Sequence, residues 1–248
     1  KDQRFALGAF LLIVANISFG AALVVANSYI PDLASPDKRD AVSSRGWASG
    51  YAGGGLLLLL NLYLYSSFES FGITEAEAVR ISLTSAGIWW ALFTIFTVRG
   101  LRSLNRKVGV VGKDAVTVGF QELKQTLKDL RKYPETLKFL IAYLFYNDGI
   151  QTVIAISGTY AILELKLEQL SLVFAIVIVQ ITALIGALLL GKLSEIYGTK
   201  KTILLSLVIW TIMVIITYFA PVGQANPYFA IAAGIGFVLG GSQALSRS

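Results

Sequence analysis

Long apolar stretches, separated by shorter charged segments, dominate this sequence. A helix that crosses a bilayer needs about 20 mostly apolar residues. Seven stretches reach that length: about 5–30, 47–67, 80–98, 137–161, 170–191, 202–220 and 227–245. Because a lipid-exposed backbone must satisfy its own hydrogen bonds, each stretch is predicted to be an α-helix. The predicted fold class is therefore an all-α membrane protein.

Composition narrows the function classes. Only 15% of the 248 residues are charged, against roughly 25% in soluble domains, so the lipid bilayer is the expected partner. The net charge of +6 does not indicate nucleic acid, because the basic residues lie between the apolar stretches. The absence of Cys and His excludes a thiol nucleophile, a Ser-His pair and an HExxH zinc site. We expect no cofactor, no metal and no enzymatic activity.

The basic residues also predict an orientation. Seventeen of the 21 Lys and Arg residues fall in the segments that follow the first, third, fifth and seventh stretches. Cytoplasmic segments carry the excess of Lys and Arg. These four segments are therefore expected on the cytoplasmic side, with the first span starting outside.

The segment 99–136 is a long basic connector between the third and fourth spans. Its apolar residues follow the spacing of one helical face: Val116, Phe120, Leu123, Leu127 and Leu130. Lysines and an arginine occupy the other faces. Two interpretations fit equally: a helix lying on the inner leaflet, or a solvated helix packed on the protein.

A glycine-rich basic segment, 191–201, lies between the fifth and sixth spans as a short hairpin. It resembles the G-x-L-a-D-r-x-G-x-[RK]-[RK] loop of the major facilitator superfamily of transporters. The matching residues are Gly191, Leu193, Glu195, Gly198, Lys200 and Lys201, with Glu where Asp is usual.

That resemblance implies two bundles of six helices, with this hairpin between the eighth and ninth helices. The seven spans then match the fourth to tenth helices of twelve, so we expect a partial fold. The implied division is 1–98 for the end of the N-terminal bundle, 99–136 for the connector and 137–248 for the start of the C-terminal bundle. The missing helices of the same chain are expected partners.

Four shorter segments carry a narrower resemblance: 16–21 (NISFGA), 43–54 (SSRGWASGYAGG), 146–149 (YNDG) and 243–248 (QALSRS). Together they resemble the autophagy-related vacuolar amino-acid effluxer family and its bacterial relatives. The resemblance implies a secondary transporter that exports small solutes such as amino acids by alternating access. A bacterial inner membrane is favoured by the compact loops and the lack of Cys; a fungal member would lie in the vacuolar membrane.

Asp148 is the one acidic residue predicted well inside a span. A charge at the bilayer centre is costly and is usually tied to a pathway or a partner. Asp148 is therefore a candidate for proton binding or for contact with a substrate amine; the alternative is a structural carboxyl paired with neighbouring helices. Tyr146, Asn147 and Gln151 flank it and fit either solute contact or interhelical hydrogen bonds.

The first span carries Asn16 and Asn27 on one polar stripe, with Asn27 expected too deep for capping, so both are candidates for the cavity wall. In the second span, Gly46, Gly50 and Gly54 repeat every four residues, which favours close helix packing. Arg45 and the hairpin residues Gly191, Glu195, Gly198, Lys200 and Lys201 are predicted to form a cytoplasmic gate, or else to serve topology alone.

The predicted function is thus a secondary transporter of small solutes, with protons as a possible coupling partner through Asp148. A different class also fits the connector: a non-transporting membrane scaffold or sensor that docks partners through its basic cytoplasmic surface.

Overall fold

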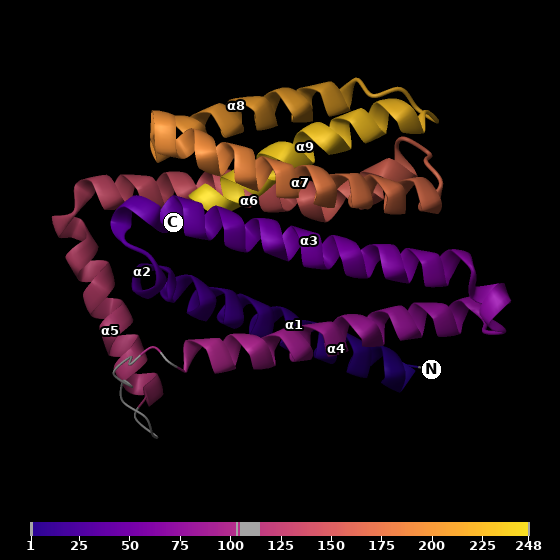
Figure 1. Cartoon of the computed structure of the whole chain (residues 1–248), viewed down its shortest axis with the longest axis horizontal. Helices are drawn as coiled ribbons and strands as arrows, with labels where there is room; N and C mark the ends of the chain where they lie inside the picture. The colour runs from indigo at the N-terminus through magenta and orange to yellow at the C-terminus, as the bar shows by residue number, and fades with distance from the viewer. Residues whose placement is uncertain (1, 103, 105–114, 248) are drawn as a thin grey trace. The chain divides into compact units, whose positions relative to one another are not determined.

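The computed structural model describes residues 2–102, 104 and 115–247 (Figure 1). Residues 103 and 105–114 of the predicted connector, and the last residue of the QALSRS segment, lie outside the described residues. The helices are α1 (Asp2–Ser28), α2 (Ile30–Leu33), α3 (Arg39–Ser66), α4 (Glu75–Leu101), α5 (Ala115–Asp129), α6 (Pro134–Leu163), α7 (Gln169–Tyr197), α8 (Thr199–Tyr218) and α9 (Ala225–Leu245). Short 3₁₀ segments lie at η1 (Pro36–Lys38), η2 (Phe68–Phe71) and η3 (Leu130–Lys132). No strand occurs in the described residues, as the all-α prediction requires.

Six described helices are long and apolar enough to cross a membrane. They are the first helix with its extension, Phe5–Leu33, together with α4, α6, α7, α8 and α9. The stretch predicted as the second span does form a helix, α3, of 28 residues. It is absent from this set because its glycines, serines and tyrosines make it less apolar than the others. The chain is an integral, multi-pass membrane protein.

The segment 191–201 is not the hairpin loop that was predicted. Helix α7 continues to Tyr197, and α8 begins at Thr199. Gly198 alone breaks the helices, with a backbone φ of +89°, a left-handed conformation that favours glycine. The Gly198 N–H donates to the carbonyl of Ser194 at 2.9 Å, and Thr202 Oγ1 donates to the carbonyl of Gly198 at 3.1 Å. A single glycine therefore makes the corner.

Two compact units make up the chain. The first contains residues 1–54, 178–218 and 230–248, and its core surrounds α9. Glycines bring the α9 backbone against its neighbours: a Cβ at Gly240 would overlap the Ala183 carbonyl oxygen of α7, and one at Gly234 would overlap the Met213 sulfur of α8. In Figure 1, α9 runs alongside α7 and α8. Small residues are how membrane helices approach this closely.

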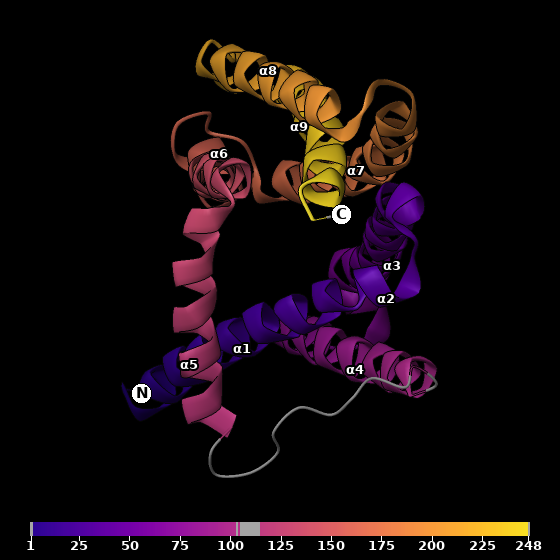
Figure 2. The same ribbon diagram turned by 90° about the vertical axis from the view of Figure 1, so that its left-hand side faces the viewer.

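The second unit contains residues 55–177 and 219–229. Helix α4 begins with a capping box, in which the Thr74 hydroxyl accepts from the Glu77 N–H and the Glu77 carboxylate accepts from the Thr74 N–H. Gly223 donates its N–H to the Leu165 carbonyl at 2.8 Å, which ties the α8–α9 loop to the α6–α7 loop. Within this unit, α5 turns away from the axis of α6 at η3 (Figure 2).

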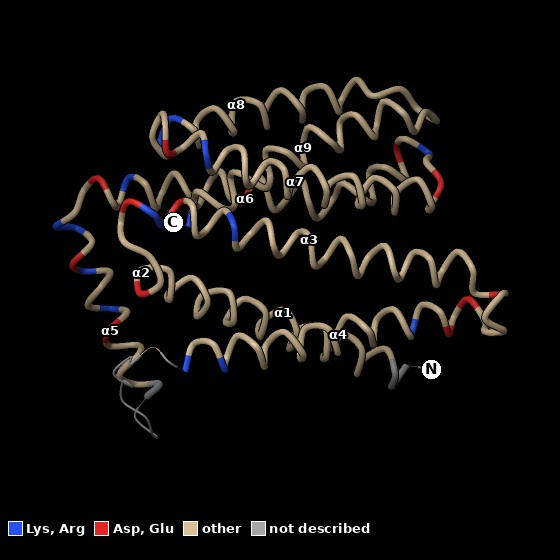
Figure 3. Tube along the Cα trace, in the orientation of Figure 1, with Lys and Arg blue, Asp and Glu red and all other residues tan. Residues whose placement is uncertain are grey.

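The charged residues lie mostly near the ends of the long helices, as expected for helices that span a membrane. Figure 3 shows Lys, Arg, Asp and Glu concentrated along α5 and near the ends of the long helices, whose middle parts are almost free of them. Large apolar side chains cover the exposed sides of the spans, among them Phe10, Leu83 and Phe145. Apolar surface of this extent is what a membrane covers.

Candidate functional site

The first candidate site lies in the first unit, where the start of α3 meets the ends of α7, α8 and α9. We call it the inner contact and define it by eight residues: Asp40, Ser43, Ser44, Trp47, Gly191, Thr199, Ala244 and Arg247. By the predicted orientation it lies at the cytoplasmic ends of these helices.

Polar side chains join α3 to α8 and α9 here. The hydroxyl of Thr199, the first residue of α8, donates to the Asp40 carboxylate at 2.5 Å. One turn further along α3, Ser43 is buried and its hydroxyl donates to the Ala244 carbonyl at 2.7 Å. Both bonds join segments far apart in the sequence and fix the start of α3 against the second half of the chain.

Small residues bring α3 and α7 together beside these bonds. A Cβ at Gly191 would overlap the hydroxyl of Ser44, so any larger residue would push α3 away. Ala48, Ala187 and Ala244 form a small buried cluster against which the Trp47 ring packs. Helices α3 and α7 are therefore in close contact through small side chains.

A cation lies over the aromatic ring at this contact. The Arg247 guanidinium carbon lies 4.8 Å from the centroid of the Trp47 ring, and one of its nitrogens donates to Gln243 Oε1 at 2.8 Å. A cation over an indole face is worth about 0.5–2 kcal/mol, depending on burial. Three buried polar atoms nearby have no hydrogen-bond partner among the described residues: Arg39 Nε, Ser44 Oγ and Arg247 Nη1.

The structure brings together only some of the predicted gate residues. Gly191 is buried at the inner contact, and Gly198 makes the corner that starts α8. The side chains of Arg45, Glu195, Lys200 and Lys201 are exposed, and no ion pair involves them in the described part of the chain. The residues that make the contact instead are Asp40, Ser43, Ser44, Trp47, Thr199 and Arg247.

Sequence reasoning missed those residues although four of them fall in the segments SSRGWASGYAGG and QALSRS. Serine, threonine and tryptophan carry no strong signal of their own. The signal available was the recurrence of both segments in one family resemblance, which marked the segments and not the partners.

The second candidate site lies in the second unit, on α6. Asp148 falls halfway along this helix, far from either end, as predicted. Its side chain is exposed, and no hydrogen bond or ion pair to it is described. Ile150, on another side of the helix, is buried at 2% exposure, so Asp148 points away from the packed side.

The neighbours of Asp148 divide between the two sides. Gln151 is exposed with Asp148, whereas Asn147 and Tyr146 are half-buried. The Tyr146 ring meets that of Tyr143 edge to face, with 5.4 Å between centroids. Gln151 and Asp148 therefore share the open face that a bound solute or a further helix would meet.

The remaining candidates stand alone. Asn16 donates its amide to the Leu12 carbonyl at 2.8 Å within α1 and is otherwise exposed. Asn27 is not deep in its helix, because α1 ends one residue later at Ser28.

The predicted packing glycines lie in α3. No atom of another element lies within 4 Å of a Cβ built at Gly46 or Gly50, and at Gly54 the Gln180 amide nitrogen lies at 3.5 Å. The packing role of these glycines stays a prediction.

No group of three or more Asp or Glu residues in the described chain could hold a metal ion.

The chain is similar to curated membrane proteins over nearly its whole length. It is 28% identical over 238 residues to an uncharacterised MFS-type transporter, YxiO, of Bacillus subtilis, which covers 95% of this chain and 54% of that protein. It is 24% identical to autophagy-related protein 22 of Yarrowia lipolytica over 333 residues and of Saccharomyces cerevisiae strain S288c over 295, each covering 99% or more of this chain and 55% of the relative. The chain thus spans about half the length of these curated relatives.

No solved structure matches the chain. The family described as vacuole effluxer Atg22 like matches residues 1–248, which confirms the predicted family. This chain belongs to the Atg22-like vacuole effluxer family.

Proposed function

We propose that this chain is part of a secondary transporter that exports amino acids by alternating access, with the inner contact as its cytoplasmic gate. The inner contact is the structural feature that supports this proposal most directly. In the predicted division, α3 belongs to the first bundle, and α7, α8 and α9 belong to the second. A contact between bundles made of hydrogen bonds and small residues can close in one state and open in another.

The chain's family supports the transport class, and the description of that family as a vacuole effluxer supports the direction. The amino-acid substrate is the one that the sequence resemblance implies. One relative is named a transporter and the family is described as a vacuole effluxer. Amino acids are zwitterions, which need a hydrogen-bonding wall to replace their water. Asn16, Asn147, Tyr146 and Gln151 are the residues that we assign to that wall.

We assign proton coupling to Asp148. It is a carboxyl in the middle of a spanning helix, and no ion pair to it is described. An intramembrane carboxyl of this kind is typical of proton relays in transporters. Protonation would change the charge of the open face on which Gln151 also lies.

The test is flux through the full-length protein in proteoliposomes, with labelled amino acids and an imposed pH gradient. With one proton per solute, a gradient of one pH unit supports about tenfold accumulation, equivalent to about 1.4 kcal/mol. Asp148→Asn is expected to abolish this gradient-driven accumulation. Glu164→Gln, at the end of the same helix, is the matched control and should keep it.

The outcomes separate the two parts of the proposal. Accumulation that Asp148→Asn leaves intact contradicts proton coupling through this residue. Absence of amino-acid flux in the wild type, under either direction of the gradient, contradicts the substrate class.

A further inference from the structure

Helix α5 crosses the direction of the spanning helix that follows it. It ends at Asp129, the 3₁₀ turn η3 follows, and α6 begins at Pro134 after the single residue Tyr133. In both Figure 1 and Figure 2, α5 leaves η3 crosswise to α6 and does not continue its axis. Since α6 crosses the membrane from its cytoplasmic end, a helix set crosswise at that end is held along the membrane surface.

The apolar face of α5 is uncovered by the described chain. Phe120 is 70% exposed, Leu127 58% and Leu123 54%, and all three lie on one side of the helix. The side chain of Val116, predicted for the same face, lies outside the described part. Three large apolar side chains on one side of an otherwise polar helix require a cover that is itself apolar.

The charges of α5 are sorted around this face. At about 3.6 residues per turn, or about 100° per residue, Lys124 falls about 65° from the centre of the apolar face and Lys128 about 105°, on the same flank. Glu122 and Asp129 fall on the other flank, about 135° and about 155° from that centre. Both lysines are exposed, as is Arg131 in η3. Lys124 therefore borders the apolar face on one flank, Lys128 lies beyond it, and the two acids lie farther from that face than either lysine.

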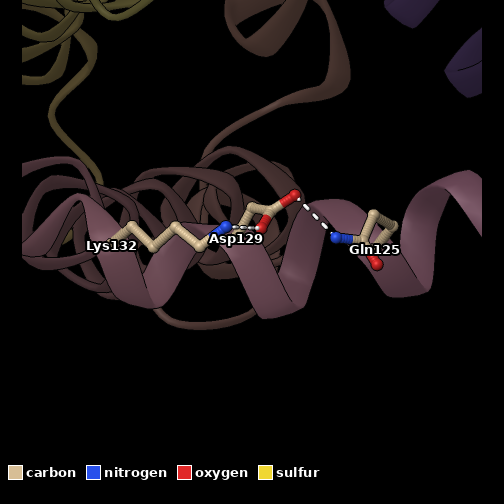
Figure 4. Close-up of polar contacts among 3 residues, drawn as sticks. All are labelled: Gln125, Asp129 and Lys132. Atoms are coloured by element: carbon tan, nitrogen blue, oxygen red, sulfur yellow. Dashed lines mark hydrogen bonds and ion pairs between the residues drawn. The ribbon is translucent and has the colours of Figure 1, made fainter.

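The acid nearest the turn is already engaged. Figure 4 shows the Asp129 carboxylate between two donors, Lys132 Nζ at 2.6 Å and Gln125 Nε2 at 2.9 Å. This arrangement joins the last turn of α5 to η3. It also leaves the charges of Lys124, Lys128 and Arg131 without a described acidic partner.

We propose that α5 lies in the cytoplasmic surface of the membrane, with Phe120, Leu123 and Leu127 among the acyl chains and Lys124, Lys128 and Arg131 on anionic phospholipid headgroups. Apolar residues bordered by lysines are the pattern of an interfacial helix. Cations near an anionic leaflet are attracted to it over about a Debye length. The inference does not depend on transport.

The chain has no cysteine, so a single introduced cysteine gives a unique spin label in these 248 residues. The full-length protein, with any cysteine outside them replaced, is reconstituted in vesicles of phosphatidylcholine with or without phosphatidylglycerol. Collision with oxygen, which concentrates in lipid, and with a water-soluble nickel chelate is measured for Leu127→Cys. Glu122→Cys, on the opposite side of α5, is the matched control.

With the anionic lipid present, the label at Leu127→Cys is expected to meet oxygen in preference to nickel, and the label at Glu122→Cys the reverse. Replacing Lys124, Lys128 and Arg131 together by Gln should cause a loss of the oxygen preference at Leu127→Cys. A label there that both reagents fail to reach shows a protein cover and overturns the proposal, as does one that nickel reaches freely. Equal burial in both lipid mixtures overturns the role of anionic headgroups.

Discussion

At the scale of single residues, the inner contact depends on small size and on single hydrogen bonds. Ser43, Ser44 and Gly191 allow the α3 backbone to lie against α7 and α9. The two charged side chains of the contact, Asp40 and Arg247, bind a hydroxyl and an aromatic ring, and no ion pair between them is described. A buried ion pair would be costly to separate and to rehydrate. Hydroxyl bonds of about 0.5–1.5 kcal/mol each can be exchanged for water at little cost. The residue types suit a contact that opens.

Asp129 gives a pH-dependent prediction. The hydrogen bond from Lys132, and then that from Gln125, hold the pKa of its carboxyl below the ordinary value of 3.8. Because the folded pKa is lowered, the bonds stabilise the α5–η3 turn fully above about pH 4 and are lost as pH falls through the folded value. The carbon-13 shift of the Asp129 carboxyl should titrate with a midpoint below 3.8.

Variants of Lys132 and Gln125, the two donors to Asp129, show which hydrogen bond lowers the pKa of its carboxyl more. Lys132→Met should raise the Asp129 midpoint more than Gln125→Ala does, since the lysine bond is the larger cause. Lys124→Met, which removes a lysine that makes no described bond to Asp129, is the control and should leave the midpoint in place. A wild-type midpoint at or above 3.8 would show that the turn seen in Figure 4 is absent in the membrane.

At the scale of helices, α9 is the element around which the first unit packs. In its most apolar window 67% of the residues are buried, whereas the corresponding windows of α1 and α4 have none. Its glycines make the difference, because they let α7 and α8 approach its backbone. Helices α1 and α4 instead offer their apolar sides to lipid or to helices outside these residues.

Gly240→Ala tests this packing. The added methyl group would overlap the Ala183 carbonyl, so the variant should lose about 1–3 kcal/mol of stability, the usual cost of overpacking. Gly87→Ala is the matched control: it lies within α4 with no atom within 4 Å of the new Cβ, and alanine is the better helix former. Unfolding of both variants in detergent by heat or denaturant measures the difference. Equal stability of the two would contradict the close approach of α9 and α7.

The positions of the helices could largely be predicted from the sequence, because hydropathy and the spacing of apolar residues depend only on nearby residues. All seven predicted stretches form helices, and the amphipathic face of the connector lies on α5. One expectation was wrong for a local reason. Residues 191–197 stay helical because one left-handed glycine, Gly198, suffices for the corner. Helix α3 forms where it was predicted, although its glycines and tyrosines make it less apolar than the other spans.

At the scale of the whole molecule, the sequence could not predict the inner contact. Ser43 and Ala244 are 201 residues apart, and Asp40 and Thr199 are 159 apart. A serine or threonine in a sequence does not identify a hydrogen-bond partner that lies so far away along the chain. Sequence reasoning chose the charged residues Arg45, Glu195, Lys200 and Lys201 for the gate, because charge is visible in a sequence whereas the fit of small side chains is not.

The central claim is that the contact between α3 and α8 must open for transport. The side chains of Asp40 and Thr199 meet at a hydrogen bond, so cysteines introduced at these two positions are neighbours while the contact is closed. The double variant Asp40→Cys with Thr199→Cys, in the full-length protein with other cysteines replaced, is oxidised in proteoliposomes and assayed for amino-acid flux. Mass spectrometry reports the fraction cross-linked, and the two single variants control for oxidation alone.

We expect the cross-linked protein to lose flux in proportion to the fraction bridged, and reduction to restore it to the level of the unoxidised double variant. The single variants should not respond to oxidant. Full flux through a completely cross-linked protein would contradict the assignment of the inner contact as a gate.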